Sequence, residues 1–324
     1  MPVTELRPLS LGELLDRTFS YYRQHFWLFI GIMAVPQVLN VALSLGLQVV
    51  THPGTSPPVT NGDPTEILRQ LAPVLAVSVI VLIIVLVGSF LIYSVALGAT
   101  TNALSDVHLG RTATVKSAYQ SLKGKVGRLF GLTFLVLFIA FGVYIGLVIV
   151  VVFLGLGLGL LLRAVAPAAG FLLPIVVGAV TALAIVVSLV FGLIFLLRYA
   201  LAVPALVLEN LAIRQALKRS AFLTQGYKGQ VFVIALLMYV VTGVVGVVFQ
   251  APFLVAGLVL GFKFGVMPLW LRVPYAISAG AGGALAGPFL MIGLALAYYD
   301  TRVRKEGFDL QLMVAALGPA SPAP

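Results

Sequence analysis

The segment Tyr298-Tyr299-Asp300-Thr301-Arg302-Val303-Arg304-Lys305-Glu306-Gly307-Phe308-Asp309 marks an abrupt change in the character of the chain. Positions 275–299 contain no charged residue, whereas the next twelve positions, 300–311, contain six. An apolar run of this length can cross the hydrocarbon core of a bilayer as a helix. The segment therefore predicts the point at which a helix leaves the membrane, and the other spans can be counted back from it.

The composition of the whole chain is typical of a membrane protein. Its 324 residues are 61% hydrophobic and 9% charged, with a mean hydropathy of +1.13. Soluble domains are nearer to roughly 45–50% apolar and about 25% charged. The apolar runs are continuous and lack the alternation that the two faces of a β-barrel impose. The sequence thus predicts an all-α, polytopic transmembrane helical bundle.

Six apolar runs are long enough to span a bilayer, and together they predict a single integral membrane domain over 1–314, followed by a disordered tail at 315–324. The runs lie at about 26–50, 72–100, 129–162, 171–197, 231–262 and 275–299. The third and fifth runs are longer than a bilayer requires, so each is expected to tilt, break or extend beyond it. Gly155, Gly157 and Gly159 are the expected place for a break in the third run, and the fifth contains Gln250-Ala251-Pro252.

The distribution of basic residues predicts the orientation of the chain. With six spans, both termini lie on one side, which holds sixteen of the twenty Lys and Arg residues. The opposite side holds only Arg69, Arg163, Lys263 and Arg272. Because loops rich in Lys and Arg remain in the cytoplasm, we expect both termini to be cytoplasmic in a multi-pass protein of the bacterial plasma membrane.

A weak threefold repeat runs through the sequence. An amphipathic segment precedes a two-span hairpin at 10–25, at 114–128 and at 211–228, and each hairpin returns with a tyrosine, namely Tyr93, Tyr199 and Tyr298. In the first segment Ser10 and Glu13 have capping-box spacing, which predicts a helix start. The three segments are expected to be interfacial helices on the cytoplasmic side. The alternatives are that the first helix packs on another part of the protein, and that basic amphipathic loops simply recur in polytopic proteins.

Residues that could perform chemistry are scarce. The chain contains no cysteine, which excludes disulfides, iron–sulfur clusters and thiolate zinc sites. His25, His52 and His108 are too far apart in sequence to form a metal-ligand motif. No Asp, Glu, Lys or Arg lies in the middle of a span, where a buried charge would mark an ion pathway. The sequence therefore predicts a protein that is not an enzyme and that has no cofactor, no metal and no catalytic residue.

Three polar residues within spans are candidate intramembrane sites: Gln37, Asn40 and Gln250. Gln37 and Asn40 share a helical face beside Pro36, and Gln250 lies beside Pro252. Each is expected either to form hydrogen bonds between helices or to line a solute site at a broken helix. Gly142 with Gly146, and Gly283 with Gly287, are expected to let helix backbones approach closely.

The net charge of +10 also predicts contacts at the cytoplasmic face. Because the basic residues flank apolar runs, anionic lipid headgroups or a protein partner explain them better than nucleic acid does. The candidate lipid or partner contacts are Lys116, Lys123, Lys125, Arg128, Arg214, Lys218, Arg219, Arg302, Arg304 and Lys305.

Several edge motifs resemble those of a bacterial integral-membrane family named for the membrane domain of glycerophosphoryl diester phosphodiesterase, much of which is uncharacterised. The motifs are Arg7-Pro8-Leu9-Ser10-Leu11-Gly12-Glu13-Leu14-Leu15-Asp16-Arg17, Tyr21 to Phe26, Ala205 to Asn210, Ala216 to Ser220, and the exit at 298–309. The resemblance implies a membrane fold, a bacterial plasma-membrane location and a connection with lipid. It implies no phosphodiesterase activity, because in the two-part enzymes hydrolysis belongs to a separate soluble barrel domain. This chain ends about fifteen residues after the last motif.

These observations lead to two functional expectations. The first is a non-enzymatic scaffold or accessory component of the inner membrane that binds lipids or a partner protein through its basic cytoplasmic segments. The alternative is a small-solute or lipid transporter with a polar site around Gln37, Asn40 and Gln250.

Overall fold

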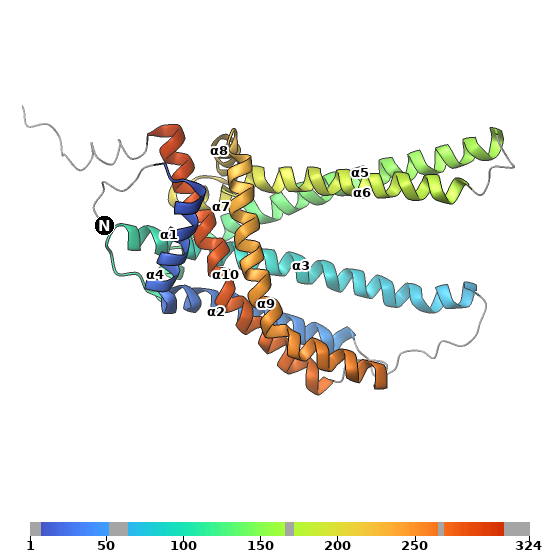
Figure 1. Cartoon of the computed structure of the whole chain (residues 1–324), viewed down its shortest axis with the longest axis horizontal. Coiled ribbons are helices and arrows are strands. Elements are labelled where there is room, and N and C mark those ends of the chain that lie inside the picture. Colours follow the sequence, from blue (N-terminus) through green and yellow to red (C-terminus); the bar gives the residue numbers. More distant parts are fainter. Residues whose placement is uncertain (1–7, 52–63, 166–171, 265–268, 308–324) are drawn as a thin grey trace, which may run out of the picture.

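The computed structural model of the chain describes residues 8–51, 64–165, 172–264 and 269–307 (Figure 1). All regular structure within these ranges is helical. Six of the helices are long and apolar enough to cross a membrane: α2 (Phe26–Thr51), α3 (Pro64–His108), α5 (Val126–Val165), α6 (Leu172–Tyr199), α9 (Lys228–Phe264) and α10 (Leu269–Glu306). The expected all-α polytopic bundle with six spans is confirmed. The tail at 315–324 lies outside the described residues.

Four short helices gather at one end of the long ones (Figure 1). They are α1 (Leu11–Gln24), α4 (Val115–Gln120), α7 (Ala202–Leu208) and α8 (Ile213–Thr224). These helices, with the adjoining ends of the six long helices, are called the cap below. Most of the buried side chains lie there, including Phe29, Leu129, Leu206, Ile234 and Tyr298.

Beyond the cap the long helices diverge. Figure 1 shows the α5–α6 hairpin and α3 extending away from the cap as separate arms. Large apolar side chains along these arms are exposed, among them Ile80, Phe138 and Leu189. Such surfaces are stable in contact with lipid, because acyl chains are as apolar as the side chains themselves. The protein thus has a packed end and an end whose helices are covered by the bilayer.

The two long apolar runs form unbroken helices. The helix α5 continues through Gly155, Gly157 and Gly159, so the break expected there is absent, and α9 continues through Pro252. A helix of 40 residues such as α5 is about 60 Å long at 1.5 Å per residue, about twice the hydrocarbon thickness. Glycine does not break a helix in lipid, because an opened backbone would find no other hydrogen-bond partner there.

The helix α10 also continues into the charged segment that begins at Asp300. It runs without interruption to Glu306, although the last apolar run was expected to end at about 299. Tyr298, Asp300, Thr301 and Val303 are buried in the cap. The charged edge therefore belongs to a helix that remains packed against other helices and does not lead directly into a loop.

The order of elements supports the threefold repeat. Each amphipathic helix precedes a hairpin: α1 comes before α2 and α3, α4 before α5 and α6, and α8 before α9 and α10. We call each amphipathic helix with its hairpin a unit. The helix α4 packs on α2 and α3 of the first unit, and α8 packs on α5 and α6 of the second. The helix α1 packs on α10 and α9 of the third unit. The third unit is thereby joined back to the first, so the three units form a closed ring.

In each of these three contacts a side-chain hydroxyl of the amphipathic helix donates a hydrogen bond to the hairpin. The Oη atom of Tyr119 on α4 donates to the carbonyl of Ile32 at 2.7 Å, and that of Tyr22 on α1 donates to the carbonyl of Leu285 at 2.8 Å. On α8, the Oγ atom of Ser220 donates to the carbonyl of Arg198 at 2.9 Å. In all three cases the acceptor is a backbone carbonyl of a long helix in the preceding hairpin.

The three amphipathic helices also agree in their caps and in their buried positions. Their N-caps are Ser10, Thr114 and Ala212, and the side chains of Glu13, Ser117 and Gln215 accept from the corresponding N-cap backbone N–H groups. Ser10 and Thr114 complete the capping box, whereas Ala212 has no side-chain oxygen with which to do so. The fourth and eighth positions after each N-cap are at most 1% exposed: Leu14 and Thr18, Ala118 and Leu122, Ala216 and Ser220.

Two details differ from expectation. The second segment, expected at 114–128, is helical only from Val115 to Gln120, and α5 begins after a turn in which Gly124 has φ +79°. The tyrosines named for the repeat do not occupy equivalent sites, since Tyr93 lies within a hairpin and Tyr298 lies in the cap. The repeat is therefore clearest in the amphipathic helices.

The path of α1 favours packing on the rest of the protein. The backbone N–H of Leu9, just before α1, donates to Asp300, and Tyr22 near its end donates to Leu285. The helix thus runs beside α10 from its charged end toward its apolar part. On this helix Leu14, Thr18 and Tyr22 are buried, while Leu11 and Phe19 remain exposed.

Candidate functional surface

A cluster of charged side chains joins α8, α10 and the end of α7. The Arg219 Nε atom lies 2.9 Å from each carboxylate oxygen of Glu209, and its Nη2 atom donates to Glu306 at 2.7 Å. Arg302 Nε lies 3.3 Å from Glu306, and the hydroxyl of Tyr298 donates to Glu209. Two guanidinium groups therefore neutralise two carboxylates. The hydrogen bonds that Arg219 donates to Glu306 are the largest cause of its raised pKa.

A second group of polar contacts fixes the start of α1 to α10. The Asp300 side chain, 1% exposed, accepts from the backbone N–H of Leu9 at 2.8 Å through Oδ1. Its Oδ2 atom accepts from Gln230 Nε2 and Arg304 Nε, each at 2.8 Å. Arg304 also donates to the carbonyl of Leu9. One carboxylate thus holds three positions, of which Leu9 and Gln230 are remote from it in sequence.

Six of the ten basic residues proposed as lipid or partner contacts bind within the protein. Arg219, Arg302 and Arg304 belong to the two groups above. Lys305 donates to the carbonyl of Phe222, Lys125 donates to that of Val207 at 2.8 Å, and Arg128 donates to the side chain of Asn210 at 2.9 Å. Burial, and next the charge of Arg128, lower the pKa of Lys125. These six cations serve first to hold the cap together.

The other four proposed residues point outward. Lys116, Lys123, Arg214 and Lys218 are exposed, and none of them pairs with another described residue. Lys116 lies on α4 and Lys123 follows it, while Arg214 and Lys218 lie one turn apart on α8. We call these four residues the basic surface. Sequence alone did not separate them from the other six, because the internal partners lie far away in the chain.

The three polar residues within spans connect helices. Gln37 Nε2 on α2 donates to the Tyr93 hydroxyl on α3 at 2.8 Å, and Asn40 Oδ1 accepts from Ser89 at 2.8 Å. Gln250 on α9 accepts from the Tyr275 hydroxyl on α10 at 3.0 Å. These contacts favour the role of helix–helix hydrogen bonds. The Nδ2 atom of Asn40 is buried without a hydrogen-bond partner among the described residues.

Glycines on α10 make room for α2. A Cβ atom added at Gly283 would lie 2.3 Å from Gln37 Nε2, and one at Gly287 would lie 2.1 Å from Met33 Cε. This pair therefore permits the close approach expected of it. Gly142 and Gly146 on α5 behave differently, since a Cβ atom at either position meets no other group within 4 Å. Both glycines are exposed on the α5–α6 arm.

The two histidines that the structure describes, His25 and His108, have different neighbours. His108 Nδ1 lies 2.7 Å from the Tyr21 hydroxyl, and its ring is stacked on Tyr299 at 6.0 Å. His25 lies at the junction of α1 and α2, and His52 lies outside the described residues. In the part of the chain that the structure describes, no three His, Asp or Glu side chains are grouped as metal ligands would be.

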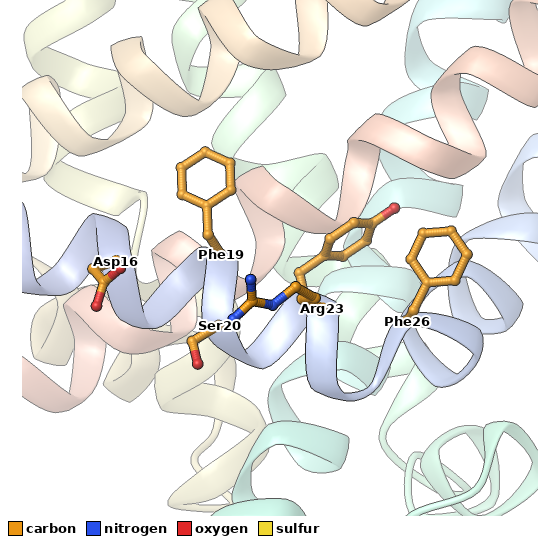
Figure 2. A pocket seen from close by; sticks show the side chains of 6 residues that line it. Asp16, Phe19, Ser20, Arg23 and Phe26 are labelled. Carbon is orange, nitrogen blue, oxygen red and sulfur yellow. The ribbon is translucent and has the colours of Figure 1, made fainter.

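The structure adds one feature that the sequence reasoning did not identify, a shallow pocket of about 510 Å³ on α1 (Figure 2). It is lined by Asp16, Phe19, Ser20, Tyr22, Arg23 and Phe26. Asp16, Ser20 and Arg23 lie four and three residues apart, which places them on one helical face. The spacing of these polar residues next to Phe19 and Phe26 is the feature of the sequence from which the pocket could have been predicted.

In comparisons with known proteins, no family model, no curated protein and no solved structure matched the chain. The resemblance drawn from the edge motifs therefore remains a prediction.

Proposed function

We propose that the chain is a non-enzymatic scaffold or accessory component of the bacterial plasma membrane, with its cap in the cytoplasm. In this role the basic surface binds anionic phospholipid headgroups of the cytoplasmic leaflet. The observation that carries the proposal is the division of the ten basic residues: six are neutralised or hydrogen-bonded inside the cap, and four are exposed and unpaired. Exposed cations near a membrane gain about 1 kcal/mol each from an anionic leaflet.

The proposed orientation draws support from where the basic residues lie. The cap contains the three amphipathic helices and the charged end of α10, to which most of the Lys and Arg residues belong. Arg69, Arg163, Lys263 and Arg272 lie near the ends of long helices that are remote from the cap. This separation matches the preference of basic loops for the cytoplasm.

The test uses full-length protein purified from native membranes, with retained lipids identified by native mass spectrometry. Changing Lys116, Lys123, Arg214 and Lys218 together to Gln should reduce retained anionic lipid severalfold relative to wild type. The matched control changes Arg69, Arg163, Lys263 and Arg272 to Gln, which removes the same charge from the other side. Equal retention of anionic lipid in both variants would overturn the proposal. If the basic-surface variant instead loses a co-purified acidic protein, the basic surface binds a protein partner and not lipid.

A transporter of small solutes or lipids is the second candidate. Its supporting observation is the buried and unpartnered Nδ2 atom of Asn40, because such a group usually binds something. The test is the rate at which proteoliposomes move a fluorescent phospholipid between leaflets. A rate equal to that of protein-free liposomes would exclude lipid transport, and a raised rate that Asn40→Leu abolishes would support it.

A further inference from the structure

The pocket on α1 combines opposite charges with aromatic rings. Asp16 and Arg23 both line it and both are exposed. Neither pairs with the other or with any other described residue. A pocket with one carboxylate and one guanidinium is neutral overall, so it has no general preference for an anion. Its charges are complementary to those of a zwitterion.

The polar groups of the pocket are suited to a phosphate and an amine. A guanidinium group binds phosphate oxygens through several N–H donors. The Oγ atom of Ser20 accepts a hydrogen bond from Gln24 Nε2 at 3.1 Å, which leaves its own hydrogen free to donate to a phosphate. Figure 2 shows the Arg23 side chain reaching back along α1 toward Ser20. A carboxylate such as Asp16 accepts from a primary ammonium, which has three donors, whereas a quaternary ammonium has none.

The polar and apolar groups of the pocket are ordered along the chain as they are in a phospholipid. The start of α1 is fixed beside Asp300 at the charged end of α10, and its last turns lie beside Leu285 and Phe289. Asp16 is therefore nearer the charged end, and Arg23 is seven residues nearer the apolar part. In a phospholipid the amine is outermost, the phosphate lies further in, and the acyl chains are innermost. Asp16 and Arg23 on α1, and then Phe26 at the start of α2, follow one another in that same order.

Aromatic groups provide the apolar end. Phe26 is the first residue of the span α2, and Phe19 lies 5.0 Å from the ring of Phe289 while remaining partly exposed. The neighbouring Trp27 is 80% exposed. Exposed aromatic side chains of this kind are typical of the boundary between headgroups and acyl chains. The pocket thus lies where one lipid molecule can place its headgroup on α1 and its chains against α2.

We infer that the pocket on α1 binds a zwitterionic phospholipid with a primary amine, of the phosphatidylethanolamine class. Arg23 and Ser20 bind its phosphate, Asp16 binds its ammonium group, and Phe19 and Phe26 contact the first part of its acyl chains. This site differs in location and in lipid class from the basic surface on α4 and α8. The experiment on this pocket therefore tests a different claim from the experiment on the basic surface.

The experiment measures lipid retention by full-length protein exchanged into detergent with equal amounts of phosphatidylethanolamine, phosphatidylcholine and phosphatidylglycerol. Native mass spectrometry should show retention of phosphatidylethanolamine in preference to phosphatidylcholine, beside the phosphatidylglycerol that the basic surface retains. Arg23→Gln should reduce that retention about tenfold, which corresponds to the loss of one charge-assisted contact. Asp16→Asn should leave total lipid retention similar but remove the preference over phosphatidylcholine.

Lys228→Gln is the matched control, because it removes an exposed charge outside both the pocket and the basic surface. It should leave retention of phosphatidylethanolamine unchanged. A larger loss of phosphatidylglycerol than of phosphatidylethanolamine in Arg23→Gln would overturn the zwitterion assignment, as would equal retention of the choline lipid by wild type. Wild-type retention in both pocket variants would show that the lipid binds elsewhere. Asp16 and Arg23 are exposed, and unchanged thermal unfolding of their variants confirms that any loss is local.

Discussion

Replacing Asp300 with Asn should loosen the cap and release the start of α1 from α10. The carboxylate is 1% exposed and accepts three hydrogen bonds, from Leu9, Gln230 and Arg304. Asparagine has nearly the same shape but replaces one oxygen with an NH₂ group. Whichever way the amide is turned, it directs a donor at another donor, and it no longer neutralises Arg304.

The size of the effect follows from the burial of the pair. Removing one partner of a fully buried ion pair costs about 3–5 kcal/mol. The Arg304 side chain is 24% exposed, so water relieves part of this cost and the lower end of that range applies, about 3 kcal/mol. At roughly 2–4 °C per kcal/mol, the midpoint of thermal unfolding should fall by about 6–12 °C.

Two measurements on detergent-solubilised protein test this expectation. Thermal unfolding gives the loss of stability, and hydrogen exchange of the peptide containing Leu9 gives the release of its N–H group. The control is Asp106→Asn, since Asp106 is more exposed and lies 4.0 Å from Arg111, so its change should stay within about 0.5 kcal/mol. If Asp300→Asn unfolds and exchanges as wild type does, this carboxylate does not anchor the N-terminal segment.

Three further predictions concern packing and hydrogen bonding within the described helices. Gly283→Ala should destabilise the protein by about 1–3 kcal/mol in thermal unfolding, because the added Cβ atom would displace the Gln37 amide and break its hydrogen bond with Tyr93. Gly142→Ala meets open space and should have little effect, so equal losses in the two variants would contradict the packing described. Arg219→Lys should lower stability by about 1–3 kcal/mol, since lysine cannot bind two carboxylates at once through a planar fork, and full stability would argue against that role. Tyr119→Phe should cost about 1 kcal/mol through loss of one hydrogen bond, and an unchanged unfolding midpoint would show that this bond contributes nothing.

Features that depend on neighbouring residues could be predicted from sequence. The capping box of Ser10 and Glu13 is visible three residues apart and is present in the structure. The six spans follow from runs of apolar residues, and the three amphipathic helices follow from local patterns. Each of these depends on interactions within one or two helical turns.

Features that depend on distant residues could not be predicted. Arg219 and Glu306 are 87 residues apart, and Lys125 and Val207 are 82 apart. A basic residue on an amphipathic helix looks the same in sequence whether its partner is a lipid or a carboxylate elsewhere in the chain. For the same reason, sequence could not show that Gly283 accommodates Gln37 whereas Gly142 faces open space.

The closed ring of three units has a consequence for how the protein is made. The helix α1 is synthesised before the six long helices, yet its main partner, α10, is the last of the described helices to be synthesised. The contacts of Leu14 and Tyr22 with α10 can therefore form only after the other five long helices have been synthesised. Docking of α1 thus requires that all six spans have been made.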